Sequence, residues 1–187
     1  MSRPLIVVLG GTRSGKSRFG RDRAVAVASG GPVTYLATAV PGDPELDDRI
    51  ARHRADRPAG WITLEPAMAL ADAIRSTPPA TTILIDGLTL WLSLVVATGG
   101  VEELEVDATL DGPVADLLDA IDDHGGPAVV VSDEIGLGLV PLDPLGRRFR
   151  DVLGFTHQRL VERSDEAWFL VAGRPIRLAE VAADALP

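Results

Sequence analysis

Cysteine does not occur in the 187-residue chain, and histidine occurs only three times. The absence of cysteine excludes disulfide bonds, thiolate metal sites and thiol catalysis. So few histidines also disfavour a metal site built from imidazole ligands. No apolar run reaches the roughly 20 residues that a membrane-spanning helix needs. The sequence therefore indicates a soluble globular protein without a membrane span.

Positive charge is scarce, because 18 basic residues stand against 27 acidic ones, for a net charge of −9. An acidic chain has no general electrostatic attraction for nucleic acids or anionic membranes. Any anion must therefore be bound by a local cluster of basic groups. Residues 1–4 lead directly into an apolar run, so we expect no signal peptide and a cytoplasmic location.

Lysine is the rarest basic residue, since Lys16 is the only lysine among those 18. It lies in the glycine-rich segment Gly10–Ser17, GGTRSGKS, which follows the apolar run Leu5–Leu9. The spacing GxxxxGKS between a strand and a helix is the pattern of a phosphate-binding P-loop. In such a loop, backbone N–H groups and the lysine bind phosphate oxygens, and the serine hydroxyl, here Ser17, ligates Mg²⁺.

Apolar runs and helix-like segments alternate along the rest of the chain. We expect strands at 5–9, 33–37, 61–65, 81–86, 128–131 and 166–172, and helices at 16–29, 44–57, 68–75, 114–124 and 145–163. The very apolar segment 87–97 should be buried or lie at a subunit contact. This alternation predicts an α/β fold with a mainly parallel sheet and helices on both faces. We expect one nucleotide-binding domain over 1–187, an antiparallel C-terminal hairpin and a weak tail at 179–187.

Two strands are expected to end in carboxylates. Asp86 closes the apolar strand 81–86, which is the Walker B pattern for a carboxylate that holds Mg²⁺ directly or through water. Asp133 and Glu134 follow the strand 128–131 in the same way. We prefer Asp86 as the metal ligand and retain Asp133 and Glu134 as alternatives.

Other strand ends are candidates for nucleotide contacts, because ligands bind beyond the carboxyl ends of parallel strands. Ala37, Thr38 and Ala39 follow the second strand and are small enough to let a nucleotide approach. Glu65 ends a short strand, where it suits either a ligand hydroxyl or amine, or an ordinary edge position.

A charged helix is expected after the second strand. Arg49, His53 and Arg57 recur every four residues and should share one face, with Leu46 and Ile50 on another. Neighbouring arginines favour the neutral, nucleophilic form of the imidazole and also suit a phosphate chain. A solvated charged helix without chemistry explains the same spacing, so the spacing alone leaves both interpretations open.

The remaining histidines and a second basic cluster receive no chemical role. His124 is expected at a helix end, where positive charge is favourable, and His157 is expected to pack within a helix interface. Arg147, Arg148 and Arg150 are interpreted as a solvated face, with an anion site as the alternative.

Six segments, in this order and combination, give the chain a wider resemblance: GGTRSGKS at 10–17, YLATA at 35–39, RIARHRADRP at 49–58, LIDGLTLWL at 84–92, VSDEIGLGLVP at 131–141 and RRFRDVLG at 147–154. Over almost its whole length the chain resembles the bifunctional adenosylcobinamide kinase / adenosylcobinamide-phosphate guanylyltransferase family of cobalamin biosynthesis.

The resemblance implies a RecA-like P-loop NTPase fold, a homotrimer and two reactions on a corrinoid substrate. The first reaction phosphorylates the aminopropanol hydroxyl of adenosylcobinamide, with GTP or ATP as donor. The second transfers GMP from GTP to adenosylcobinamide phosphate through a GMP–histidine intermediate. Mg²⁺ is the implied metal, held by Ser17 and Asp86.

The family's guanylylated histidine falls on His53, which becomes the candidate catalytic residue together with Lys16. The candidate nucleotide-binding residues are Gly10, Gly11, Thr12, Arg13, Ser14, Gly15, Lys16, Ser17, Ala37, Thr38, Ala39, Arg54, Ala55, Asp56, Arg57, Glu65 and Asp86.

Four positions depart from the family's usual pattern. Asp133 and His157 stand where asparagine is usual, Gly87 where cysteine is common, and Asp86 where some members have glutamate. Two alternatives to the family's function are a different small-molecule P-loop kinase without histidine chemistry and a non-catalytic nucleotide switch.

Overall fold

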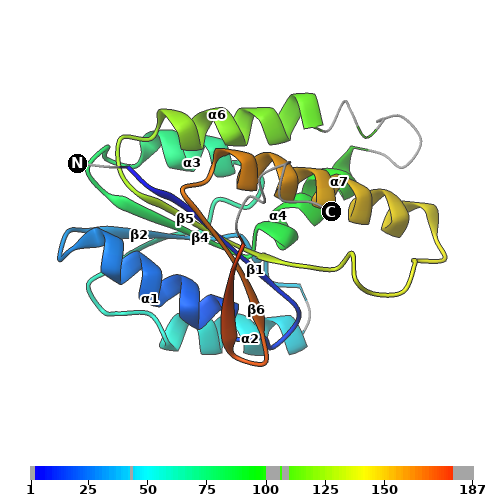
Figure 1. Ribbon diagram of the computed structural model, residues 1–187, viewed down its shortest axis with the longest axis horizontal. Coiled ribbons are helices and arrows are strands. Elements are labelled where there is room, and N and C mark those ends of the chain that lie inside the picture. The colour runs from blue at the N-terminus through cyan, green and yellow to red at the C-terminus, as the bar shows by residue number, and fades with distance from the viewer. Residues whose placement is uncertain (1–2, 43, 100–105, 107–109, 179–187) are drawn as a thin grey trace, which may run out of the picture.

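The computed structural model describes residues 3–42, 44–99, 106 and 110–178 (Figure 1). The expected tail at 179–187 lies outside this range. Within it, no helix is both long and apolar enough to cross a membrane.

A seven-stranded sheet in the order β3-β2-β4-β5-β1-β6-β7 forms the centre of the molecule. Neighbouring strands pair in parallel, except for the antiparallel pair β6 and β7 at the C-terminal end. The α/β prediction and the C-terminal hairpin are therefore confirmed. The strands are β1 (Leu5–Gly10), β2 (Val33–Ala37), β3 (Ile62–Leu64), β4 (Thr82–Asp86), β5 (Ala128–Asp133), β6 (Glu166–Val171) and β7 (Arg174–Leu178).

Helices cover both faces of the sheet (Figure 1). Helices α1 (Lys16–Ala28) and α2 (Pro44–Ala55) lie on one face. The other face carries α3 (Leu70–Ser76), α4 (Leu88–Thr98), α6 (Ala115–Asp123) and α7 (Pro144–Arg163), with the short turn η1 (Leu110–Val114) before α6. The apolar segment expected at 87–97 is largely α4, and Trp91 within it is buried, with its indole N–H bonded to the Met68 carbonyl oxygen at 3.1 Å.

The central strands are buried on both faces, which explains their continuous apolar sequences. In β1, Ile6 and Val8 pack toward α1, whereas Val7 and Leu9 pack toward the helices of the opposite face. This alternation gives two cores, one on each side of the sheet. The prediction that 1–187 forms one domain stays a prediction.

His124 differs from its expected role as a charged helix end. The side chain is 6% exposed, and its Nε2 lies 2.8 Å from the carbonyl oxygen of Thr81. The residue leaves the helical conformation at the end of α6 and turns inward toward the start of β4. Its role is therefore to satisfy a buried backbone carbonyl, since such a group is costly to leave unpaired.

Gly20 allows α1 to lie close to the sheet. A Cβ atom built at this position would lie 2.4 Å from Cγ2 of the buried Val131 in β5. Gly154, in the middle of α7, has nothing within 4 Å of a built Cβ atom. The two glycines thus share a helical backbone but differ in the space around them.

We predict that Gly20→Ala lowers the free energy of unfolding by about 1–3 kcal/mol, because the added methyl group overpacks the core. Gly154→Ala is the matched control and should raise it by up to about 1 kcal/mol through helix propensity. Urea denaturation measures both changes. Equal shifts in the two variants would contradict the close packing of α1 on β5.

Candidate active site

The P-loop joins β1 to α1 at the carboxyl edge of the sheet. Gly15 has a φ of 94°, a left-handed conformation that favours glycine, and α1 begins at the next residue. The Lys16 side chain is buried, donates to the Gly11 carbonyl oxygen at 3.2 Å and forms an ion pair with Asp133. The turn of the C-terminal hairpin supports the loop, because the Gly173 N–H donates to the Ser14 carbonyl oxygen at 2.9 Å.

Asp86, at the end of β4, accepts hydrogen bonds from two elements. The Ser17 hydroxyl donates to Oδ1 at 3.0 Å, and the Tyr35 hydroxyl donates to Oδ2 at 2.5 Å. His53 Nδ1 lies 3.4 Å from the same Oδ2. Burial acts to raise the pKa of the Asp86 carboxyl, but the bonds from His53, Tyr35 and Ser17 outweigh it and hold that pKa below its usual range. The carboxylate is therefore ionised at neutral pH.

The donor set of Ser17 and Asp86 fits the site expected for Mg²⁺. In P-loop proteins this ion takes a hydroxyl and one carboxylate, with further ligands from phosphates and water. The alternatives have other partners: Asp133 pairs with Lys16, and Glu134 accepts from the Gly136 N–H. The geometry thus favours Asp86 over Asp133 and Glu134.

Helix α2 places His53 against this carboxylate. Arg57, just beyond the helix, stacks on the Tyr35 ring with its guanidinium carbon 4.0 Å from the ring centre. Ile50 lines the same cavity as His53 and Arg57, so the prediction that it lies on another face is wrong. The spacing i, i+3, i+7 puts all three residues on one side of a helix. The side chains of Leu46 and Arg49 lie outside the described structure.

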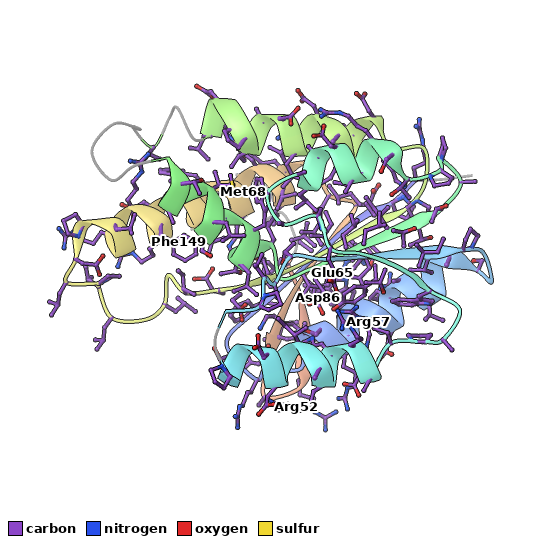
Figure 2. The ribbon with its side chains drawn as sticks, turned by 180° about the vertical axis from the view of Figure 1, so that it is seen from behind. Arg52, Arg57, Glu65, Met68, Asp86 and Phe149 are labelled. Atoms are coloured by element: carbon purple, nitrogen blue, oxygen red, sulfur yellow. The ribbon has the colours of Figure 1, made fainter. Side chains whose placement is uncertain are left out.

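A cavity opens between the strand ends and α2. Figure 2 shows Arg57, Glu65 and Asp86 gathered there, whereas Phe149 lies on α7, away from them. We call it the β-end cavity; it is lined by Lys16, Ser17, Tyr35, Ala37, Thr38, Ala39, Ile50, His53, Arg57, Glu65, Asp86, Gly87, Leu90 and Asp133. The Thr38 hydroxyl is occupied, since it donates to the Gly87 carbonyl oxygen at 2.6 Å.

A second cavity, of about 430 Å³, lies between the P-loop, α1 and α2. We call it the α1–α2 cavity; its lining residues are Thr12, Arg13, Ser14, Gly15, Lys16, Ser17, Arg18, Arg21, Arg52, His53 and Asp56. Lys16, Ser17 and His53 line both cavities. The structure therefore brings His53, from α2, to the boundary between two spaces that share the P-loop.

Four of the expected nucleotide-binding residues, Gly10, Gly11, Arg54 and Ala55, line neither cavity. The Arg54 side chain forms an ion pair with Glu65 at the rim, and both side chains are largely exposed. Gly10 and Gly11 lie at the start of the P-loop, where the Gly10 carbonyl oxygen accepts from the Glu134 N–H at 3.0 Å. All other expected residues line one cavity or both.

Sequence reasoning did not identify several of the residues that build the site. Tyr35 lies two residues before Ala37 and therefore shares its face of β2, a signal that strand alternation offers. Arg21 lies one helical turn after Ser17, so it faces the same space. Leu90 and Arg52 offered no comparable signal.

Sequence reasoning also missed a buried polar chain behind the site. The Asp133 N–H donates to the Thr89 hydroxyl at 2.7 Å, whose oxygen lies 2.9 Å from Ser132 Oγ. Ser132 Oγ in turn lies 2.8 Å from Nε2 of His157, and the other ring nitrogen lies 3.5 Å from a carboxylate oxygen of Glu134. His157 is indeed packed in the α7 interface as expected, but it also completes this chain. Arg147 donates to the Pro141 and Leu142 carbonyl oxygens and lines neither cavity.

Comparison with known proteins gives a consistent picture. The family model described as cobinamide kinase / cobinamide phosphate guanyltransferase matches residues 6–178. The bifunctional adenosylcobalamin biosynthesis protein CobP of Pseudomonas aeruginosa is 44% identical over 173 residues, covering 92% of this chain and 95% of that protein. The corresponding CobU protein of Salmonella typhimurium is 34% identical over 183 residues, covering 93% and 99%.

A solved structure supports the fold class. It is an ATPase domain that superimposes with a TM-score of 0.51 at 13% identity, covering 90% of this chain and 69% of that one. At such low identity the likeness concerns the P-loop NTPase fold alone.

We predict a pH dependence of stability that originates at His157. Burial lowers the pKa of its imidazole, although Glu134 and Asp133 oppose this. The unfolded chain thus takes up a proton at higher pH than the folded chain. The buried neutral imidazole of His157 should therefore contribute fully to the free energy of unfolding above about pH 6.5. This contribution should be lost as the pH falls below that value.

Urea denaturation at about pH 7.5 and about pH 5.5, on either side of the ordinary histidine pKa, measures this loss. In His157→Gln, which keeps a polar side chain without a titrating group, the difference between the two pH values should be smaller. An equal difference in both proteins would contradict the assignment.

Proposed function

Because the chain belongs to the cobinamide kinase / cobinamide phosphate guanyltransferase family, we propose that it phosphorylates adenosylcobinamide and then transfers GMP from GTP to adenosylcobinamide phosphate through His53. The observation that carries the proposal is the position of His53, whose Nδ1 faces the Asp86 carboxylate 3.4 Å away beside the P-loop. An acidic partner at one ring nitrogen fixes the tautomer with the proton on that nitrogen, as in other activated histidines.

In guanylyl transfer, the lone pair of His53 Nε2 attacks the α-phosphorus of GTP. A nitrogen–phosphorus bond forms, and the bond from phosphorus to the pyrophosphate oxygen breaks. The imidazole then carries positive charge, which the ionised Asp86 beside Nδ1–H stabilises. In the second step an oxygen of the acceptor's phosphate attacks the same phosphorus, and Nε2 recovers its lone pair.

The P-loop holds the phosphates in both reactions. Its backbone N–H groups and Lys16 bind phosphate oxygens, so Lys16 exchanges Asp133 for a substrate oxygen when nucleotide enters. Ser17 and Asp86 would hold Mg²⁺, which supplies neutralisation of phosphate charge. For the kinase step, the corrinoid's hydroxyl oxygen attacks the γ-phosphorus of GTP or ATP, and the nucleoside diphosphate leaves.

The β-end cavity is the place we assign to the nucleoside. It measures about 50 Å³, so it must widen to admit a base, and its wall is formed by the small Ala37 and Ala39 and the apolar Leu90. Glu65 extends a carboxylate toward the same cavity and can accept from hydroxyl or amine groups of the nucleoside. Arg57, held on Tyr35, presents a planar cation that suits a phosphate or a base.

We also propose the remaining family properties, a cytoplasmic homotrimer whose subunits are single domains. The support for self-association is the loop after β5, in which Leu137, Leu139 and Leu142 are 83%, 96% and 97% exposed. Apolar groups gathered in this way mark contact surfaces in many proteins.

The histidine mechanism predicts covalent labelling. Incubation with Mg²⁺ and GTP labelled at the α-phosphate should give an acid-labile, base-stable label on the protein, because a phosphoramidate has this stability. His53→Ala should abolish the label, and the control His124→Asn, remote from both cavities, should keep it. Absence of label would favour the alternative of a P-loop kinase without histidine chemistry or a nucleotide switch, and label on His53→Ala would refute the assignment.

The kinase step predicts dependence on the only lysine. Lys16→Ala should lower the rate of adenosylcobinamide phosphorylation by about 100-fold or more, because an oriented cation at the phosphates is lost. Arg75→Ala removes a solvent-exposed arginine on α3 and serves as the control. Conversion of adenosylcobinamide is followed with GTP and with ATP, and unchanged activity of Lys16→Ala would contradict the role of the P-loop.

A further inference from the structure

The α1–α2 cavity has an excess of positive charge that the residues so far assigned do not explain. Beyond the P-loop, it is lined by Arg18 and Arg21 from α1 and by Arg52 from α2. Lys16 and Arg13 add to these, whereas Asp56 is the one carboxylate among the described lining residues. In a chain of net charge −9, such a concentration of cations indicates a site for an anion.

The P-loop residues Thr12, Ser14 and Gly15 and the cation of Lys16 line the same cavity. Arg21 is largely buried, and its guanidinium lies 3.6 Å from the carboxylate of Asp56, which lines the same cavity. The cavity therefore combines a charged side chain from each helix with donors of the P-loop.

The reaction geometry indicates which anion this is. Displacement at phosphorus proceeds in line, so the nucleophile and the leaving group lie on opposite sides of the phosphorus atom. When His53 attacks GTP, pyrophosphate leaves on the side away from His53. When the acceptor attacks the guanylylated histidine, it must approach from that same side. One space therefore serves the leaving pyrophosphate and then the acceptor's phosphate.

We propose that the α1–α2 cavity is this space, and that Arg21 and Arg52 bind the phosphomonoester dianion of the acceptor where pyrophosphate has left. The inference rests on the proposed guanylyl transfer through His53. His53 is part of the wall that the two cavities share. With its nucleoside in the β-end cavity, a guanylyl group on His53 would turn its open phosphorus face toward the arginines. Arginine suits this task, because its planar fork binds two phosphate oxygens at once.

The guanylylated protein permits a direct test. The parent protein and the variants Arg21→Gln and Arg52→Gln are incubated with Mg²⁺ and an excess of GTP labelled at the α-phosphate, which guanylylates His53. Free nucleotide is then removed. Release of label is followed with adenosylcobinamide phosphate, with pyrophosphate and with water alone. Arg75→Gln on the opposite face of the sheet is the matched control.

In both arginine variants, the concentration needed for half-maximal release should rise about tenfold for each of the two anions, as expected for loss of one charge-assisted hydrogen bond. Release by water should be unchanged, because water needs no anion site. Asp56→Asn should lower the concentration of each anion needed for half-maximal release, since it removes a carboxylate that repels anions.

Normal release to both anions in both variants would overturn the proposal, as would a defect toward pyrophosphate alone. A change in release by water would also count against it, because it would indicate a disturbed His53. Failure of the parent protein to take up label refutes the proposed function itself and is thus distinguished from failure of this inference.

Discussion

The carboxylate of Asp86 accepts hydrogen bonds from Ser17 and Tyr35 and faces His53, although it is buried at the end of β4. A buried charge is tolerated only where several donors compensate for the lost water. Those donors come from the P-loop helix, from β2 and from α2, so the three elements converge on one side chain. The position of the nucleophile that we propose, His53, thus depends on the same carboxylate that we propose as a ligand of Mg²⁺.

Much of this arrangement could be predicted from local patterns. The P-loop spacing and the apolar strand that ends in Asp86 each follow from a short segment, and the structure brings Ser17 and Asp86 together as that pattern requires. His53 was different, because its spacing among arginines is equally typical of a solvated helix. Its assignment depends on the family resemblance and stays a proposal, for which the distance of 3.4 Å between His53 and Asp86 is the structural support.

The remainder could not be predicted, because it depends on contacts between distant elements. The chain from Asp133 through Thr89 and Ser132 to His157 joins three elements that are separate in sequence. Similarly, the inward turn of His124 depends on a free carbonyl group at Thr81. Ile50 differs for a simpler reason: the spacing of Arg49, His53 and Arg57 predicts a face without Ile50, but Ile50 precedes His53 by three residues and therefore shares its side of α2.

The support that Gly173 gives to the Ser14 carbonyl has a consequence for biosynthesis. The P-loop lies at 10–17, yet one of its backbone contacts is made by Gly173, which follows all the strands but β7 in the sequence. Strand β1 is likewise flanked by β5 and β6, which are synthesised much later. Such non-local contacts form late during folding. A nascent chain on the ribosome therefore carries the complete P-loop sequence long before β5, β6 and Gly173 are available to support the loop.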